Sequence, residues 1–358
     1  MEMFKVAKFY YSLKVAFKND SNTLLYSGKS FYNKSNSVDM TITENEIHIA
    51  FSRSKKFSKE DLFDTPSSQI RYHLQKALCF YLATVGSIPE VESMTFNTLD
   101  KVGENVTASE EVSHKEFSSG WHKCKAEVTI PCEIGNMIFR NGEGYKRFYI
   151  SLTYFLKSQL SKFSDDGLGW VWSSFNALYT YLYSYENQTD KEDRISEQAK
   201  INYFFEKRKT LKLKESVAYI KTLDKEIFWK NIGWYVYTEN MHLERFDNYY
   251  RDEIILSNII KYANIHGERK TPQSKTAYNR IKKCLEHHEI CYKERVLFLI
   301  CDYCYMLRNR IFHAGKSYPL FVISEKYETL FNNEIRKVML LLLKDVYEEL
   351  LFDNQKNE

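Results

Sequence analysis

The sequence predicts an α+β domain over residues 1–142, followed by an all-α helical bundle over residues 143–358. Three observations predict this fold class. Before residue 142, apolar and polar residues alternate in short segments, which is typical of half-buried strands. After residue 144, apolar residues recur at every third or fourth position, which is typical of helices. Between the two patterns lies Asn141-Gly142-Glu143-Gly144, a glycine-rich break that marks the boundary.

The N-terminal domain contains strand and helix patterns. Strands are expected within residues 4–17, 47–51 and 126–130. A helix is expected over residues 67–83, because five apolar positions fall on one face. These positions are Ile70, Leu74, Ala77, Leu78 and Tyr81. The polar segment 100–120 is expected to form a loop.

The C-terminal part is a series of helix patterns. The first helix contains Phe148 to Leu160, and Ser164-Asp165-Asp166-Gly167 is expected to break the pattern after it. The charged segment 186–194 is expected to be a turn. The other expected helices cover residues 168–185, 195–209, 211–220, 252–263, 272–288, 294–313 and 332–351.

Composition favours a soluble cytoplasmic protein. The aliphatic runs are too short to span a bilayer, and the first residues lack the basic-then-apolar pattern of a signal peptide. Seven cysteines without a regular framework favour free thiols in a reducing compartment. A net charge of +4 permits a nucleic-acid partner without requiring one. No glycine-rich phosphate loop occurs in the sequence, and no cofactor is expected.

The candidate site is the segment Arg308-Asn309-Arg310-Ile311-Phe312-His313, which follows the apolar residues 296–307. Because of that apolar segment, we expect the site to lie on a core helix. On a continuous α-helix, Asp302, Asn309 and His313 would share a polar stripe, with Gly315 as the C-cap. The buried stripe of the same helix would contain Ile300, Cys304, Leu307 and Ile311.

Arginine and histidine side chains suit RNA cleavage. Histidine can take or give a proton near neutral pH, and the planar fork of arginine can bind a phosphate that gains charge. No metal is required if the 2′-hydroxyl of the RNA is the nucleophile. A structural interpretation stays open, in which Arg308 pairs with a surface carboxylate and His313 caps its helix.

The segment Leu307–Gly315 resembles the Arg-Asn-x-x-x-His signature of the HEPN superfamily, many of whose members are metal-independent ribonucleases of toxin and antiviral systems. The segment Trp170–Tyr179 also resembles the helix that opens many larger HEPN domains. The resemblance covers about residues 145–352. It implies that Arg308 and His313 are catalytic, that Asn309 positions them, and that a homodimer brings two motifs into one cleft.

The resulting hypothesis is an endoribonuclease that leaves a 2′,3′-cyclic phosphate and acts as a toxin or in antiphage or stress defence. Residues 1–142 would sense a signal, restrain the ribonuclease domain or position its substrate, with a regulatory protein or a small molecule as the trigger. Members of the family controlled by AMP transfer often carry a tyrosine where this chain has Gly315, so that control is not expected. The alternative is a non-catalytic HEPN-like module that dimerises or binds nucleic acid or protein.

Further polar residues have two interpretations each. Four basic residues are candidate contacts to RNA phosphates, although a solvated helix end explains Lys207 and Arg208 equally well. The four residues are Arg310, Lys316, Lys207 and Arg208. Asn176 is either a buried hydrogen-bonding hub or a partner of the site.

The cysteine and histidine spacing predicts no metal site. Cys301 and Cys304 have a spacing that zinc ligands use, but they fall within an expected core helix, where cysteines pack as small apolar residues. Cys284, His287, His288 and Cys291 provide no second Cys-x-x-Cys pair. Strand alternation is the expected explanation for a third group, which consists of His122, Cys124 and Cys132.

Overall fold

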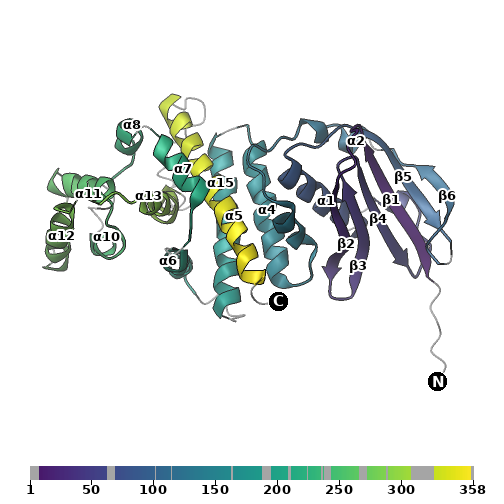
Figure 1. Ribbon diagram of the computed structural model, residues 1–358, viewed down its shortest axis with the longest axis horizontal. Helices are drawn as coiled ribbons and strands as arrows, with labels where there is room; N and C mark the ends of the chain where they lie inside the picture. The colour runs from purple at the N-terminus through teal and green to yellow at the C-terminus, as the bar shows by residue number, and fades with distance from the viewer. Residues whose placement is uncertain are drawn as a thin grey trace, which may run out of the picture. The chain divides into compact units, whose positions relative to one another are not determined.

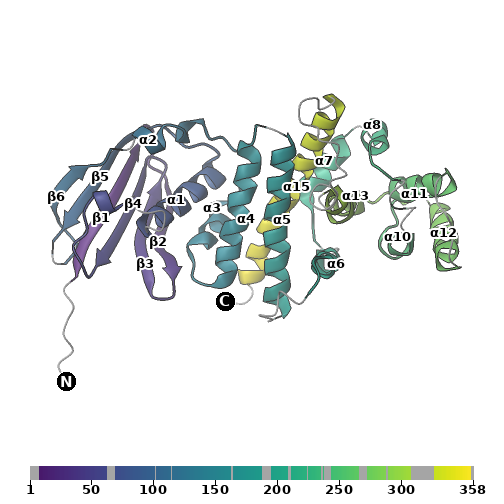
Figure 2. The same ribbon diagram turned by 180° about the vertical axis from the view of Figure 1, so that it is seen from behind.

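The computed structural model groups the chain into two compact units, which are residues 1–194 with 347–358, and residues 195–346. Figures 1 and 2 show the elements from opposite sides. The structure describes residues 8–62, 69–100, 102–113, 115–162, 164–187, 195–208, 211–223, 225–234, 237, 243–265, 272–287, 289–307 and 326–355.

A six-stranded sheet in the order β2-β3-β4-β1-β5-β6 forms the N-terminal part of the first unit. Each neighbouring pair is antiparallel. The strands are β1 (Phe9–Phe17), β2 (Leu24–Asn33), β3 (Asn36–Thr43), β4 (Glu46–Arg53), β5 (Val91–Leu99) and β6 (Val106–Glu111). The expected strands around residues 4–17 and 47–51 are confirmed as β1 and β4.

Helix α1 (Gln69–Val85) covers one face of this sheet and contacts β2, β3 and β4 (Figure 1). Its side chains Ile70, Leu74, Ala77 and Tyr81 are buried, as the apolar stripe predicts, whereas Leu78 is only half-buried. The helix expected over residues 67–83 is therefore confirmed in place and orientation. Short helical turns complete this part: η1 (Glu60–Leu62), α2 (Lys115–Ser118), η2 (Trp121–Lys123), α3 (Cys132–Gly135) and η3 (Asn136–Phe139).

One strand prediction is wrong, and one loop prediction is wrong in part. Residues 126–130 are not a strand, although Val128 and Ile130 are buried. The side-chain amide of Gln159 takes the place of a partner strand: Val128 N–H donates to its Oε1 (2.8 Å), and its Nε2 donates to Val128 O (3.1 Å). Within the expected loop 100–120, β6 forms a sheet edge. All six of its residues are exposed, so no apolar alternation revealed it.

Helices α4 (Glu143–Leu160) and α5 (Ser164–Asn187) pack against each other within the first unit. The expected break between two helices is confirmed after Leu160, but Ser164–Gly167 do not form it, because they are the first turn of α5, where acidic side chains are favourable. Since α4 also contacts α1 and η3, the compact unit continues to residue 194 rather than dividing at the predicted boundary of residue 142.

The second unit is helical, as the sequence predicts. Its long last helix, α15 (Lys326–Gln355), supplies Tyr347 and the residues after it to the first unit. The other helices are α6 (Glu197–Arg208), α7 (Lys214–Thr222), α8 (Lys225–Lys230), α10 (Leu243–Tyr249), α11 (Glu253–Ile265), α12 (Pro272–Leu285) and α13 (Tyr292–Phe298). None of the helices in the described part of the chain is long and apolar enough to cross a lipid bilayer.

The first unit, called the sheet unit from here on, contains a buried histidine. His73 Nδ1 lies 2.8 Å from Ser30 Oγ, and one turn further along α1, Lys76 Nζ donates to Phe31 O (2.8 Å). Burial lowers the pKa of His73 to about 3, and the positive charges of Lys76 and Arg53 add to this shift. His73 is therefore neutral in the folded protein.

We expect His73 to make the sheet unit less stable in acid. Because its folded pKa lies below its unfolded value, the unfolded chain binds more protons, and stability falls as pH falls through about 6.5. Between pH 7 and pH 5 this loss should be about 2 kcal/mol. Urea unfolding followed by circular dichroism should show a smaller loss for His73→Gln. His122→Gln, at an exposed position, should behave like wild type.

Candidate functional site

The helix that leads to the predicted motif is α13, followed by the π-helical turn η5 (Leu299–Cys304) and a helical continuation to Leu307. Every residue from Arg295 to Cys304 is buried. The expectation of a core helix before the motif is therefore confirmed. The predicted site residues Arg308, Asn309, Arg310, His313 and Lys316 lie outside the described residues, together with Ile311 and Gly315.

Asp302 does not lie on an exposed polar stripe, which corrects the prediction. It is only 5% exposed and accepts a hydrogen bond from the Tyr250 hydroxyl. Ile300 and Cys304 are buried as predicted, whereas Leu307 is half-buried. This helix is surrounded by other groups on all sides, so its burial is not confined to one stripe.

The helix before the motif is also not a continuous α-helix, because it contains the π-helical turn Leu299–Cys304. A π turn closes its hydrogen bonds one residue later than an α turn. Each residue of an α-helix turns the chain by about 100°, so one additional residue shifts everything after it by about that angle. The spacing of seven between Asp302 and Asn309 assumed a continuous α-helix, and that assumption does not hold across Leu299–Cys304.

A buried ion pair fixes α13 to the start of α11. Arg295 Nε lies 2.9 Å from Asp252 Oδ2, and the two side chains are 2% and 0% exposed. Asp252 Oδ2 also accepts from Cys291 N–H (2.7 Å). Its Oδ1 accepts from Ile254 N–H (3.0 Å) and Ile255 N–H, so that it caps α11. All of these charges and donors are satisfied, as burial requires.

Two residues just before Arg295 in α13 form hydrogen bonds to other segments of the chain. Glu294 Oε2 accepts from the backbone N–H groups of Arg251 (2.6 Å) and Asp252 (2.8 Å), and burial raises the pKa of this carboxyl. Lys293 Nζ donates to Leu211 O. The sequence contains a signal for the cap, since Asp252 directly precedes a helix pattern. It contains none for the pairing of Asp252 with a residue 43 positions away.

The segment Trp170–Tyr179, predicted to open a HEPN-like domain, forms part of α5 in the first unit. Its buried hydrogen bonds centre on Ser174, whose Oγ donates to Ser151 O (2.7 Å). Ser151 Oγ lies 2.6 Å from the Tyr347 hydroxyl, and burial raises the pKa of Tyr347 to about 12. Asn176, considered as a hub, is half-buried and accepts from Thr180 Oγ1 (3.3 Å).

Two of the basic residues predicted to contact RNA phosphates, Lys207 and Arg208, lie on α6. Lys207 is exposed near the C-terminal end of α6, with its Nζ 5.5 Å from the Tyr203 ring centroid, and Arg208 is the last residue of that helix. This placement suits both an RNA contact and a solvated helix end, since a cation there also offsets the helix dipole.

The cysteines are free thiols. Cys301 and Cys304 are buried in η5, and burial raises the pKa of the Cys304 thiol. The strand explanation for His122 and Cys132 is wrong, because they lie in η2 and α3. Within the described ranges, no cluster of three or more histidine, cysteine, aspartate or glutamate side chains could hold a metal ion. His288 lies outside those ranges.

Comparison with known proteins gives no match to this chain among protein-family models, curated proteins or solved structures.

Proposed function

We propose that this chain is a metal-independent endoribonuclease of the HEPN type. The sequence Arg308-Asn309-Arg310-Ile311-Phe312-His313, placed directly after a helix buried on all sides, is the observation that carries the proposal. The Arg295–Asp252 ion pair anchors that helix, and a fixed support is what a catalytic constellation requires. The antiparallel sheet of residues 9–111 would then serve regulation or substrate positioning.

In the proposed reaction, the 2′-oxygen of the RNA attacks the adjacent phosphorus while the bond from phosphorus to the 5′-oxygen breaks. The products are a 2′,3′-cyclic phosphate and a 5′-hydroxyl. His313 takes the 2′-proton or gives a proton to the leaving oxygen, and a homodimer would supply one histidine for each transfer. Arg308 binds the phosphate as its charge grows, and Asn309 positions both side chains.

Binding of the rest of the RNA would be electrostatic. Arg310, Lys316, Lys207 and Arg208 are the proposed contacts to backbone phosphates, and such contacts make binding weaken as salt rises. We propose a cytoplasmic toxin or an effector of antiphage or stress defence as the biological role. The competing proposal is a HEPN-like module that binds or dimerises without catalysis.

We expect purified protein to cut total RNA in the presence of excess EDTA. The reason is that the RNA supplies its own nucleophile, while His313 and Arg308 supply proton transfer and charge stabilisation. Gel electrophoresis measures the cleavage, and the fragments should carry a cyclic phosphate. If EDTA stops cleavage and Mg²⁺ restores it, this mechanism is wrong. If His313→Ala cuts as fast as wild type, the activity does not come from this motif.

A further inference from the structure

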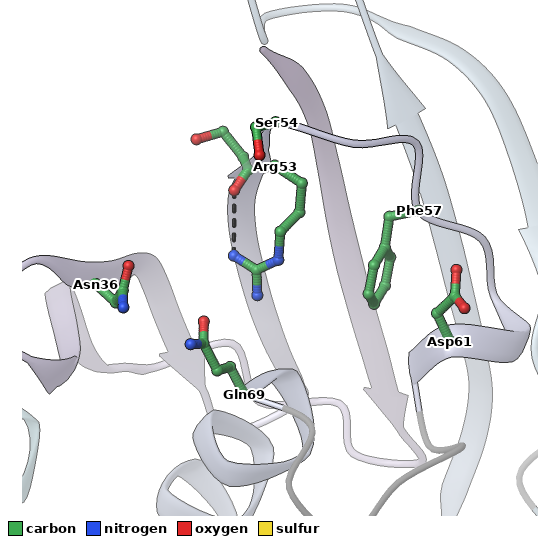
Figure 3. Close-up of a pocket in the computed structure, with 7 residues that line it drawn as sticks. Asn36, Arg53, Ser54, Phe57, Asp61 and Gln69 are labelled. Atoms are coloured by element: carbon green, nitrogen blue, oxygen red, sulfur yellow. Dashed lines mark hydrogen bonds between the residues drawn. The ribbon is translucent and has the colours of Figure 1, made fainter. Parts of the chain in front are cut away.

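A pocket of about 470 Å³ lies on the first unit where β4 ends and α1 begins. Figure 3 shows side chains from several elements around it, and polar side chains predominate. They include Asn36 at the start of β3, Arg53 at the end of β4, Ser54, Phe57, Asp61 in η1 and Gln69 at the start of α1. None of them belongs to the proposed ribonuclease motif.

Arg53 is a cation without a carboxylate partner in this pocket. Its guanidinium carbon lies 5.3 Å from the Phe51 ring centroid and 5.9 Å from that of Phe57, and its Nη1 donates to Ser52 O (3.1 Å). Among the described residues, no carboxylate lies within ion-pair distance of it. Burial lowers its pKa, so an anion beside it would relieve the cost of burying this charge.

The acidic residue of the pocket does not neutralise Arg53. Asp61 Oδ2 instead accepts hydrogen bonds from Ser58 N–H (2.8 Å) and Ser58 Oγ (3.1 Å). In Figure 3 the guanidinium of Arg53 points toward Gln69. The donors of the arginine fork therefore face the side of the pocket where the Gln69 amide lies.

A second positive charge lies on α1. Lys76, two turns into α1, is 1% exposed, and its Nζ lies 4.9 Å from the Tyr72 ring centroid. The first turn of α1 contains no acidic residue, and the N-terminus of a helix favours an anion. Burial is the main cause of the low pKa of His73, and the positive charges of Lys76 and Arg53 lower this pKa further.

We propose that this pocket binds the phosphate group of a small ligand, with the Arg53 guanidinium as its principal contact. Arginine presents paired donors that match two phosphate oxygens. The Ser54 hydroxyl and the side-chain amides of Asn36 and Gln69 supply further donors around the same space. This site is additional to the proposed function and does not depend on it.

Isothermal titration calorimetry of the full chain with inorganic phosphate, UMP and uridine tests the site. Wild type should bind phosphate and UMP at millimolar concentration or below, and uridine much more weakly. Arg53→Met replaces the guanidinium with an unbranched apolar side chain and removes the charge, and it should weaken phosphate and UMP binding by at least about tenfold. Lys56→Ala removes an exposed neighbouring charge outside the lining and should have little effect.

A second pair of variants keeps the test independent of Arg53 packing. Ser54→Glu places a negative charge in an exposed loop of the pocket and should abolish phosphate binding, whereas Ser109→Glu on exposed β6 should not. Tighter binding of UMP than of phosphate would identify a nucleotide, and equal binding would identify free phosphate. Equal binding of uridine and UMP, unchanged affinity in Arg53→Met, or no binding of phosphate and UMP by wild type would each overturn the proposal.

Discussion

Replacing His313 with alanine should lower the rate of RNA cleavage by about 10²- to 10⁴-fold, because a general acid or base typically contributes that much. The expected result follows from the proposed role of His313 in proton transfer at the 2′-oxygen or the 5′-oxygen. Rates are measured with a labelled RNA on gels, under excess enzyme. His287→Ala is a matched control, since His287 is exposed and lies in the same unit.

Arg308 and Asn309 should show graded effects in the same assay. Arg308→Ala should resemble His313→Ala, and Arg308→Lys should recover activity only in part, because lysine keeps the charge but loses the paired donors. Asn309→Ala should have a smaller effect, since its proposed role is to position the other two.

Light scattering of the purified wild type should give the mass of a dimer. A monomer that still cuts RNA would argue against two motifs in one cleft.

Replacing Asp252 with alanine should lower the free energy of unfolding of the second unit by about 3–5 kcal/mol. The change leaves the Arg295 charge buried without its partner, and it also removes the cap of α11 and the acceptor for Cys291 N–H. Urea unfolding followed by circular dichroism measures the loss. We expect a midpoint shift large enough to separate the unfolding of this unit from that of the sheet unit.

The double variant Asp252→Ala with Arg295→Met tests whether the two side chains act as a pair. Removing both charges should cost less than the sum of the single changes, because neither partner is left buried and unpaired. Glu90→Ala breaks the exposed Lys18–Glu90 pair and should change stability little, since solvent screens surface pairs. Additive losses in the double variant would show that the two side chains do not act as a pair.

The sequence predicted helices and strands best where their buried residues recur with a simple period. The stripe of α1 and the alternation of β4, where Ile47, Ile49 and Phe51 are buried, show that period directly, and both elements were found. Strand β6 was missed because its exposed residues carry no apolar signal. Residues 126–130 were predicted as a strand from their alternation, and Val128 and Ile130 are indeed buried, but the backbone of Val128 bonds to the Gln159 side-chain amide and not to a neighbouring strand.

For the candidate site, sequence reasoning predicted the buried helix but not the groups that hold it. The apolar segment 296–307 predicted the core position of η5. Asp302 was assigned to a polar stripe from its spacing of seven to Asn309, whereas its buried hydrogen bond with Tyr250 depends on a contact across 52 positions. Long-range pairs such as this one and Arg295–Asp252 leave no local pattern.

The π-helical turn Leu299–Cys304 has a consequence for how relatives of this chain should be recognised. Such a turn is equivalent to the insertion of a single amino acid into an α-helix, and the core around it fixes where that additional residue is accommodated. A protein that lacks the inserted residue could retain the same letters after it and yet turn the positions of Tyr305, Met306 and Leu307 by about 100° around the helix axis. A one-residue gap ahead of the motif would therefore be as informative as the motif itself when two sequences are aligned.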